Sequence, residues 1–354
     1  VNLSCGLDLF LAELKLRRNV RSSLLETYGD ELLRIVFEDP YALVSAVSGV
    51  GFKMADEIAV RLGLERKSRS RIAAGIEFIL REAAKADGNC GLPVELLVKR
   101  AHELLGVEPS LIISAVEDGV AEKFSVPQDL GGTPYLFLSH LHDAENEIAT
   151  RIKAMVDGAP ALDEHQVARG LTSAQSKFEF ELAEAQKKAI TSSLSNKITV
   201  ISGGPGVGKT TIIRGIIVTL AEAKVDFALC APTGRAAKRL EEASGKPATT
   251  IHRLLEYSKG GRFERNSSHP LDVNIVVCDE ASMIDVELMG SLMNALGDRT
   301  ALVLVGDIDQ LPPVGPGQPF RDIIKSGRVE VAYLNQNFRQ AENSGIPAAA
   351  MAVN

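Results

Sequence analysis

A glycine-rich segment at residues 203–210 reads Gly-Gly-Pro-Gly-Val-Gly-Lys-Thr and stands between an apolar run and a helical pattern. In this context, glycines allow backbone N–H groups to curl around phosphates at a helix N-terminus. Lys209 supplies a compact positive charge for β- and γ-phosphates, and the hydroxyl of Thr210 suits Mg²⁺. The alternative is a glycine-rich turn without a ligand. We expect an ATP and Mg²⁺ site formed by Gly203, Gly204, Pro205, Gly206, Val207, Gly208, Lys209, Thr210 and Thr211.

An acidic pair follows a second apolar run. Asp279 and Glu280 come directly after Val276-Val277-Cys278. Asp279 is expected to hold Mg²⁺ through water, and Glu280 to orient and deprotonate the attacking water. Such a pair alone is often only solvated loop charge. Together with the glycine-rich loop, it predicts the second half of a nucleotide hydrolysis site.

A third apolar run ends in Gly306-Asp307-Ile308-Asp309-Gln310. We expect the amide of Gln310 to bind the γ-phosphate and to report its loss. Taken alone, the segment would be a turn.

Short apolar runs at 198–201, 227–230, 275–278 and 301–305 must position these residues. Most of them are separated by helical segments, a pattern typical of an α/β domain with a buried, largely parallel sheet. We assign this domain to residues 176–330. The chain of 354 residues is long enough for two or three domains.

The N-terminal part has a different pattern of apolar residues. Apolar residues from Arg18 to Lys85 recur at spacings of three and four, which predicts short helices in an all-α region over 1–90. Residues 91–175 are expected to form a mainly helical connecting domain.

Composition excludes several classes of protein. The sequence has 45% hydrophobic and 24% charged residues, so it is neither collagenous nor disordered. It shows no membrane span or secretion signal, and its 4 cysteines form no CxxC pair, which fits a reducing cytoplasm. The net charge of -7 does not exclude DNA, because residues 101–200 carry 8 basic and 15 acidic side chains, while residues 66–71 hold a local basic run. That run is equally compatible with a solvated linker.

From residue 182 to 340 the sequence resembles the RecD-like family of superfamily 1 DNA helicases. The blocks that carry this resemblance, in the family's order, are 185–190, 203–210, 231–240, 250–255, 279–282, 306–312 and 334–340. The resemblance implies a RecA-like fold for the α/β domain. It also implies roles for further residues: Gln186 reads adenine, and Arg339 contacts the γ-phosphate. Pro232, Thr233, Arg235 and His252 are expected to contact single-stranded DNA.

A second resemblance lies in residues 39–43 and 48–59, which are similar to the helix-hairpin-helix region of long-form RecD-like helicases. A hairpin with Gly49 and Gly51 directs backbone N–H groups and a helix N-terminus at a DNA phosphate. With Lys53, these residues are expected to bind DNA without sequence preference. A tight turn without DNA contact is the alternative.

The resemblance implies an ATP-driven helicase that moves 5′ to 3′, acts on single strands and duplex junctions, and works beside recombination or repair subunits. Residues 331–354 are expected to begin a second motor domain that is mostly missing, so this chain alone should not unwind DNA. Two other interpretations stay open: a P-loop ATPase that acts as a DNA-binding switch or loader, and a DNA-binding fragment without enzymatic activity.

Overall fold

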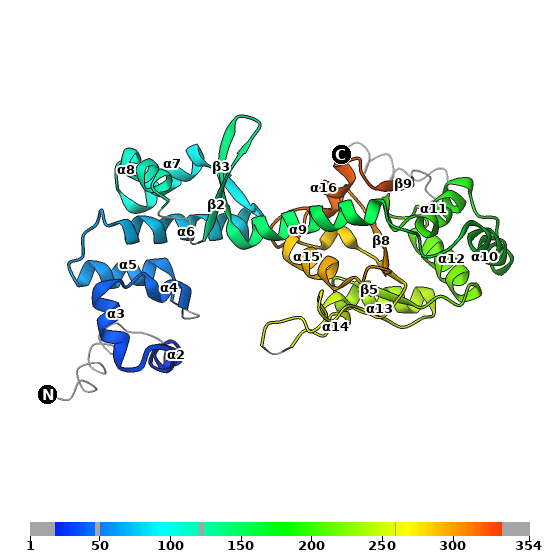
Figure 1. Cartoon of the computed structure of the whole chain (residues 1–354), viewed down its shortest axis with the longest axis horizontal. Coiled ribbons are helices and arrows are strands. Elements are labelled where there is room, and N and C mark those ends of the chain that lie inside the picture. Colours follow the sequence, from blue (N-terminus) through cyan, green and yellow to red (C-terminus); the bar gives the residue numbers. More distant parts are fainter. Residues whose placement is uncertain (1–17, 47–49, 120–123, 259, 335–354) are drawn as a thin grey trace. The chain divides into compact units, whose positions relative to one another are not determined.

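The computed structural model describes residues 18–46, 50–119, 124–258 and 260–334, and the chain divides into two compact units (Figure 1). The first unit is 1–142 and the second is 143–354. Helix α9, Ser139–Val156, begins in the first unit and continues in the second. The expected connecting segment 91–175 is therefore shared between the units. The boundaries at 90, 175 and 330 stay predictions.

The first unit begins with short helices, as the spacing of its apolar residues predicts. They are α2 Arg18–Tyr28, the 3₁₀ turn Gly29–Glu31, α3 Leu32–Glu38, α4 Ala42–Ala46, α5 Phe52–Arg61 and α6 Arg69–Asp87. The apolar faces of α2, α3, α4 and α5, together with Val50 just before α5, meet in one core, made by Val20, Leu24, Leu32, Val36, Leu43, Val50 and Ile58. The helix-hairpin-helix region thus has a hydrophobic core of its own.

A partly buried ion pair fastens α5 to α6. Arg71 Nε donates to Asp56 Oδ1 at 2.7 Å and Arg71 Nη2 to Asp56 Oδ2 at 3.0 Å. The hydroxyl of Tyr41 donates to the same Oδ1 at 2.6 Å, and Arg71 Nη1 also donates to the carbonyl oxygen of Leu105 at 2.9 Å. These bonds satisfy both charges, with the Arg71 side chain buried and that of Asp56 half-buried.

The rest of the first unit contains the helices that the sequence predicts and, in addition, strands that it does not predict. Helices α7 Val94–Leu105 and α8 Pro109–Glu117 are present, but they accompany an antiparallel sheet in the order β1-β3-β2. Its strands are β1 Gly91–Pro93, β2 Ser125–Leu130 and β3 Thr133–Leu138. Prolines within β2 and β3 weaken the strand pattern in the sequence. The hairpin turn at Gly131-Gly132 uses positive φ angles of 63° and 88°, which glycine adopts freely.

A six-stranded parallel sheet in the order β6-β5-β7-β8-β4-β9 forms the centre of the second unit. The strands are β4 Ile198–Gly203, β5 Phe227–Ala231, β6 Ala248–Thr250, β7 Ile275–Cys278, β8 Ala301–Gly306 and β9 Glu330–Leu334. The residues of β7 and β8 are buried throughout, as expected for strands covered on both faces. This confirms the predicted α/β class with a parallel sheet.

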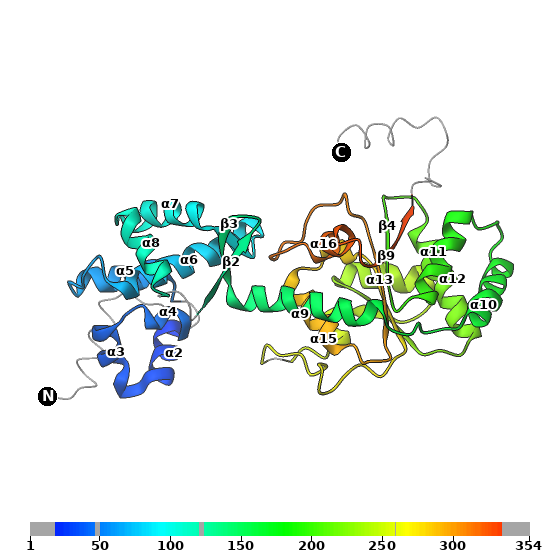
Figure 2. The same cartoon turned by 45° about the horizontal axis from the view of Figure 1, so that its top comes forward.

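Helices cover both faces of this sheet. They are α9, α10 Glu164–Lys177, α11 Glu184–Ser195, α12 Lys209–Glu222, α13 Gly234–Ser244, α14 Ile251–Leu254, the 3₁₀ turn Ala281–Met283, α15 Val286–Ala295 and α16 Pro319–Lys325. Figures 1 and 2 show α10, α11 and α12 on one side of the sheet and α9 and α15 on the other. A Cβ at Gly170 of α10 would lie 2.2 Å from the side chain of Thr219 of α12. Glycine therefore allows α10 to pack closely against α12 and to hold it against the sheet.

Strand β9 completes this sheet at the β4 edge. Its residues 331–334, which the sequence assigned to the start of a second motor domain, pair in parallel with residues 200–203 of β4. Among the described residues, no helix is long and apolar enough to cross a membrane.

Candidate nucleotide and DNA site

The glycine-rich loop connects the end of β4 to the start of α12. Gly206 and Gly208 both have φ of 86°, the left-handed region that favours glycine. A Cβ at Gly203 would lie 2.8 Å from the Cβ of Leu334 and from a methyl group of Val207. The loop is thus fixed from beneath by β9 and by the buried side chain of Val207. The fold requires glycine at these positions, whereas phosphate binding by the loop stays a prediction.

Lys209 begins α12 and turns its side chain back over the loop. Its ammonium group donates to the carbonyl oxygen of Gly203 and, at 3.2 Å, to that of Gly204. Thr210 is exposed and Thr211 half-buried at the N-terminus of the helix. The positive end of the helix dipole and the ammonium group therefore meet at the loop, where an anion is favoured.

The acidic pair follows β7, as the sequence predicts. The backbone N–H of Asp279 donates to the carbonyl oxygen of Cys230 on β5 at 2.9 Å, which fixes the start of the acidic turn. Burial raises the pKa of the Asp279 carboxyl above its ordinary value. The hydrogen bond from the Glu280 N–H and the positive charges of Lys209 and Arg239 oppose this effect and lower the pKa of Asp279.

Glu280 has two unusual features. Its φ is 53°, a left-handed conformation that costs a non-glycine residue on the order of 1 kcal/mol or more. Its Oε2 is buried and has no hydrogen-bond partner among the described residues. An unpaired buried carboxylate oxygen is expensive, and strain together with such an oxygen is typical of a functional site.

A cleft of about 1010 Å³ brings these parts together. The predicted residues that line it are Gly204, Pro205, Gly206, Gly208, Lys209, Thr210, Thr211, Thr233, Arg235, Asp279, Glu280 and Gln310. They come from the carboxyl ends of β4, β5, β7 and β8, which meet at one edge of the parallel sheet. Gly203 and Val207 support the loop rather than line the cleft.

The residues fit Mg²⁺ together with nucleotide phosphates. The hydroxyl of Thr210 and the carboxylate of Asp279 are the hard oxygen ligands that Mg²⁺ prefers. Mg²⁺ in such sites takes one or two protein ligands and completes its shell with water and phosphate oxygens. Accordingly, the described residues include no group of three or more acidic, histidine or cysteine side chains that could hold a metal alone.

Gln186, expected to read adenine, lies outside the cleft lining. Its side chain is only 4% exposed, and its Oε1 accepts the backbone N–H of Ala183 at 3.0 Å, so it caps the start of α11. Its role toward adenine stays a prediction.

The four predicted contacts to single-stranded DNA in the second unit occupy different places. Thr233 caps α13 by accepting the N–H of Ala236 at 3.2 Å, and Arg235 is exposed on that helix; both line the cleft. Pro232 and His252 lie outside the lining. The His252 ring instead packs 5.4 Å from Tyr257 and 5.6 Å from Phe263, between ring centroids, in an aromatic cluster.

The cleft lining also includes residues that were not predicted from the sequence, among them the charged Arg239 and Glu242. Arg239 lies on α13 four residues after Arg235, so both arginines face the same side of the helix. The four-residue spacing in the sequence indicates that the two arginines share a helix face. Only the fold shows that this face of α13 lines the cleft.

In the helix-hairpin-helix region, Gly51 and Lys53 are exposed at the start of α5. Space around Gly51 is open, with no atom within 4 Å of a Cβ built there. Gly49 and Arg339 lie outside the described residues, so their predicted contacts stay predictions. In the basic run, Arg71 packs against Asp56 and Arg69 pairs with Asp118 at 2.9 Å. Arg66 and Lys67 are exposed and have no ion pair within the part of the chain that the structure describes.

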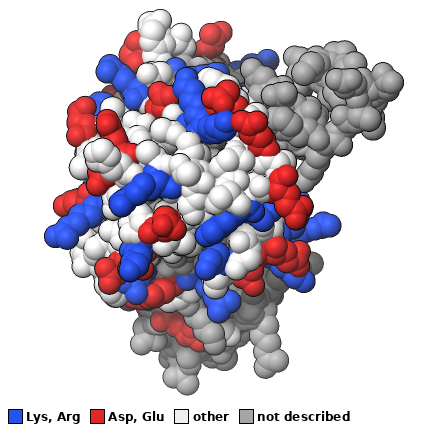
Figure 3. Space-filling model, turned by 90° about the vertical axis from the view of Figure 1, so that its right-hand side faces the viewer, with Lys and Arg blue, Asp and Glu red and all other residues white. Residues whose placement is uncertain are grey.

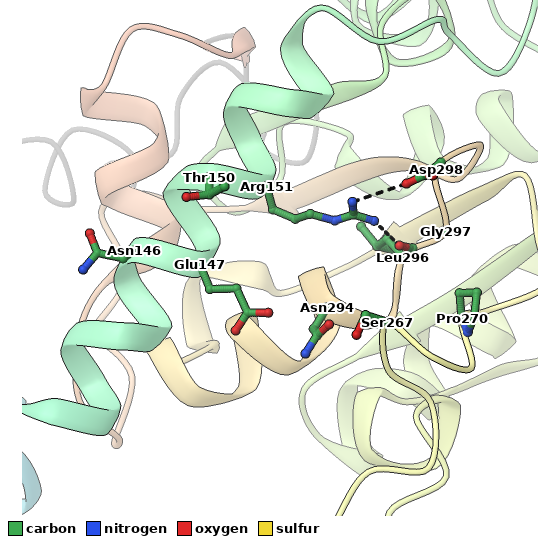
Figure 4. Close-up of a pocket in the computed structure, with 10 residues that line it drawn as sticks. All are labelled: Asn146, Glu147, Thr150, Arg151, Ser267, Pro270, Asn294, Leu296, Gly297 and Asp298. Atoms are coloured by element: carbon green, nitrogen blue, oxygen red, sulfur yellow. Dashed lines mark hydrogen bonds and ion pairs between the residues drawn. The ribbon is translucent and has the colours of Figure 1, made fainter.

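A second hollow, of about 550 Å³, lies beside α9 (Figure 4). Its central side chain, Arg151, donates to the carbonyl oxygens of Met293 and Leu296 and pairs with Asp298 at 3.5 Å. The guanidinium thus ties α9 to the end of α15. We interpret this hollow as structural, because its one arginine is already engaged.

The face at the α10 end of the second unit shows basic and acidic side chains interspersed (Figure 3). Mixed charge of this kind does not form the continuous positive surface that nucleic acids favour. This face therefore gives no support to a DNA-binding role.

Comparison with known proteins yields two family models. Residues 186–316 match the family described as "AAA domain", and residues 7–91 match "ATP-dependent RecD2 DNA helicase HHH domain". These matches cover the cleft and the helix-hairpin-helix region, respectively.

Two curated relatives have similar sequences. The ATP-dependent RecD2 DNA helicase of Deinococcus radiodurans is 30% identical over 349 residues, which are 96% of this chain and 48% of that protein. The RecBCD enzyme subunit RecD of Mycolicibacterium smegmatis is 37% identical over 194 residues, which are 48% of this chain and 35% of that protein. The chain thus spans about half the length of the first relative and about a third of the second.

Proposed function

Because this chain belongs to the RecD-like helicase family and carries an N-terminal helix-hairpin-helix region, we propose that it is part of an ATP-dependent DNA helicase. The observation that supports this best is the single cleft that unites Lys209, the acidic pair and Gln310. In this proposal, ATP hydrolysis drives movement along single-stranded DNA in the 5′ to 3′ direction.

In the chemical step, a water molecule attacks the γ-phosphorus and the bond to the bridging oxygen of the β-phosphate breaks, which releases ADP and phosphate. The Glu280 carboxylate accepts the proton from the water, a role for which its unpartnered Oε2 is available. Lys209 leaves the carbonyl oxygens of the loop and neutralises charge on the β- and γ-phosphates.

Thr210 and Asp279 would hold Mg²⁺, which screens phosphate charge when bound. Gln310, at the end of β8 between the strands of the loop and the acidic pair, contacts the γ-phosphate and transmits its loss. Arg339 adds a further positive charge to the γ-phosphate.

DNA contact is divided between the two units. Arg235 and Thr233 at the start of α13, with Pro232 and His252, hold the strand backbone, while Gly51, Lys53 and Gly49 contact phosphates without sequence preference. Duplex junctions are the proposed substrates, and recombination or repair subunits the proposed partners. The cytoplasmic location stays a prediction.

The test is ATP hydrolysis and strand separation, measured with and without single-stranded DNA, on this chain and on a polypeptide that continues past Asn354. We expect stimulation by DNA and separation of a tailed duplex in the longer polypeptide. Stimulated hydrolysis without strand separation would favour a DNA-binding switch. Binding of DNA without any hydrolysis would favour a non-enzymatic role.

A further inference from the structure

Helix α13 places a second arginine on the wall of the nucleotide cleft. Arg239 lines the cleft with Lys209, Asp279 and Glu280, one helical turn after Arg235. The helix is held at its start by the Thr233 cap and packs against both α12 and β5. Arg239 therefore projects from a fixed support beside the residues that would act on ATP.

The guanidinium of Arg239 is exposed and, within the described ranges, takes part in no ion pair or hydrogen bond. The neighbouring Lys238 is different, because it pairs with Glu242 at 3.8 Å. Arg239 does not fasten the fold in the way that Arg71 and Arg151 do. Its donors remain available to a ligand in the cleft.

The position of Arg239 relative to the acidic pair indicates which part of a nucleotide it would meet. It lines the same cleft as Lys209 of the glycine-rich loop and as Asp279 and Glu280. Asp279 is the carboxylate that would hold Mg²⁺ against the terminal phosphates. Arg239 thus lies on the phosphate side of the cleft, whereas Gln186, proposed for adenine, lies outside the cleft lining.

We propose that Arg239 donates hydrogen bonds to the terminal phosphate of ATP and so makes the cleft prefer ATP to ADP. This inference rests on the proposed function, since it needs Mg·ATP in the cleft. A guanidinium presents two parallel donors that match phosphate oxygens, and its charge does not depend on pH. Because ADP lacks the terminal phosphate, it lacks the group that Arg239 contacts.

The test compares affinities for Mg·ADP and for Mg with a non-hydrolysable ATP analogue, by calorimetric titration of the whole chain. Arg239→Ala should weaken binding of the analogue by about tenfold or more and change binding of ADP less than about twofold. Arg239→Lys should be intermediate, because it keeps the charge and loses the planar fork. Lys238→Ala is the matched control on the same helix and should bind both nucleotides as the wild type does.

Equal weakening for ADP and the analogue, or no weakening, would overturn the assignment. So would a variant that keeps its nucleotide affinities and loses affinity for single-stranded DNA, because the guanidinium would then serve the DNA backbone. Lys209→Ala separates this inference from the proposed function. If Lys209→Ala weakens binding and Arg239→Ala does not, only the inference fails, whereas a wild type that binds neither nucleotide overturns both.

Discussion

The backbone N–H of Glu280 donates a 2.9 Å hydrogen bond to Oδ1 of Asp279. This bond, together with the left-handed backbone of Glu280, places the two adjacent carboxylates at the end of β7 in different environments. Asp279 has one oxygen engaged and its carboxyl held close to the loop, whereas Glu280 keeps a buried oxygen without a partner. The pair can therefore combine a metal ligand with a proton acceptor.

Asp279→Asn should raise the thermal midpoint of the chain in Mg-free buffer at neutral pH, because it removes a carboxylate whose charged form is disfavoured by burial. The asparagine oxygen can still accept the Glu280 N–H. Because the pKa of Asp279 is raised in the folded wild type, its charged carboxylate destabilises the folded state fully at pH values above that pKa. This destabilisation fades as the pH falls through the raised pKa toward the ordinary value of 3.8. The difference in thermal midpoint between Asp279→Asn and the wild type should therefore shrink over the same pH range. Asp272→Asn, at an exposed position, serves as the control. A variant less stable than the wild type at neutral pH would contradict this.

Glu280→Gln should leave the affinity for Mg·ATP within about threefold and lower the turnover of the hydrolysing polypeptide by about 10²–10⁴. The amide keeps the shape of the side chain and cannot accept the proton from water. Titration and steady-state hydrolysis measure the two effects separately. Parallel loss of affinity and turnover would instead indicate a structural role for the side chain.

Asp56→Ala should destabilise the first unit by about 3 kcal/mol, because it leaves the buried Arg71 guanidinium without its counter-ion. Denaturant unfolding measures the change. The control is Glu38→Ala, whose partner Arg34 is exposed, and which should have no measurable effect. If both variants lost the same free energy of unfolding, the pair of Asp56 and Arg71 would contribute no more to stability than an exposed pair.

The same pair gives a pH dependence of opposite sign to that of Asp279. Burial alone would raise the pKa of Asp56, but hydrogen bonds from Arg71 and Tyr41 and the charge of Arg71 lower it below 3.8. The stabilisation is present above the ordinary pKa and is lost as the pH falls through the lowered one. Asp56→Asn should therefore flatten the acid limb of the stability curve. An unchanged acid limb would argue against this linkage.

Lys53→Ala should reduce the slope of log affinity for single-stranded DNA against log salt by about 0.7, the value for one lost phosphate contact. Gly51→Glu should weaken binding uniformly across DNA sequences without unfolding the region, since a Cβ meets no atom within 4 Å. Lys85→Ala, at the far end of α6, serves as the control. A slope that is unchanged in Lys53→Ala would remove this residue from the DNA interface.

The sequence was most informative where local pattern and three-dimensional position coincide. The loop glycines and the acids after β7 were predictable because every parallel strand ends at the same edge of the sheet. The β2–β3 hairpin was missed because Pro127 and Pro134 hide the strands, although Gly131-Gly132 carries the signal of a turn.

Arg239 could not be identified from the sequence, because its importance depends on which face of α13 meets the cleft. The ion pair between Asp56 and Arg71 was hidden for a similar reason. Arg71 belongs to a run of basic residues that the sequence leaves open between DNA contact and a solvated linker, yet its partner lies 15 positions earlier on another helix. Contacts between different helices depend on how the helices pack, and they produce no periodic pattern in the sequence.

The most direct test of the central claim is a titration of Mg·ATP into the wild type, Lys209→Ala and Lys188→Ala. Lys188 is exposed on α11, away from the cleft lining, and controls for loss of one positive charge. We expect the wild type and Lys188→Ala to bind alike, and Lys209→Ala to bind at least about tenfold more weakly, because Lys209 is the lysine of the described cleft lining and its compact charge is lost. Equal affinity in all three proteins would contradict the assignment of the cleft to ATP.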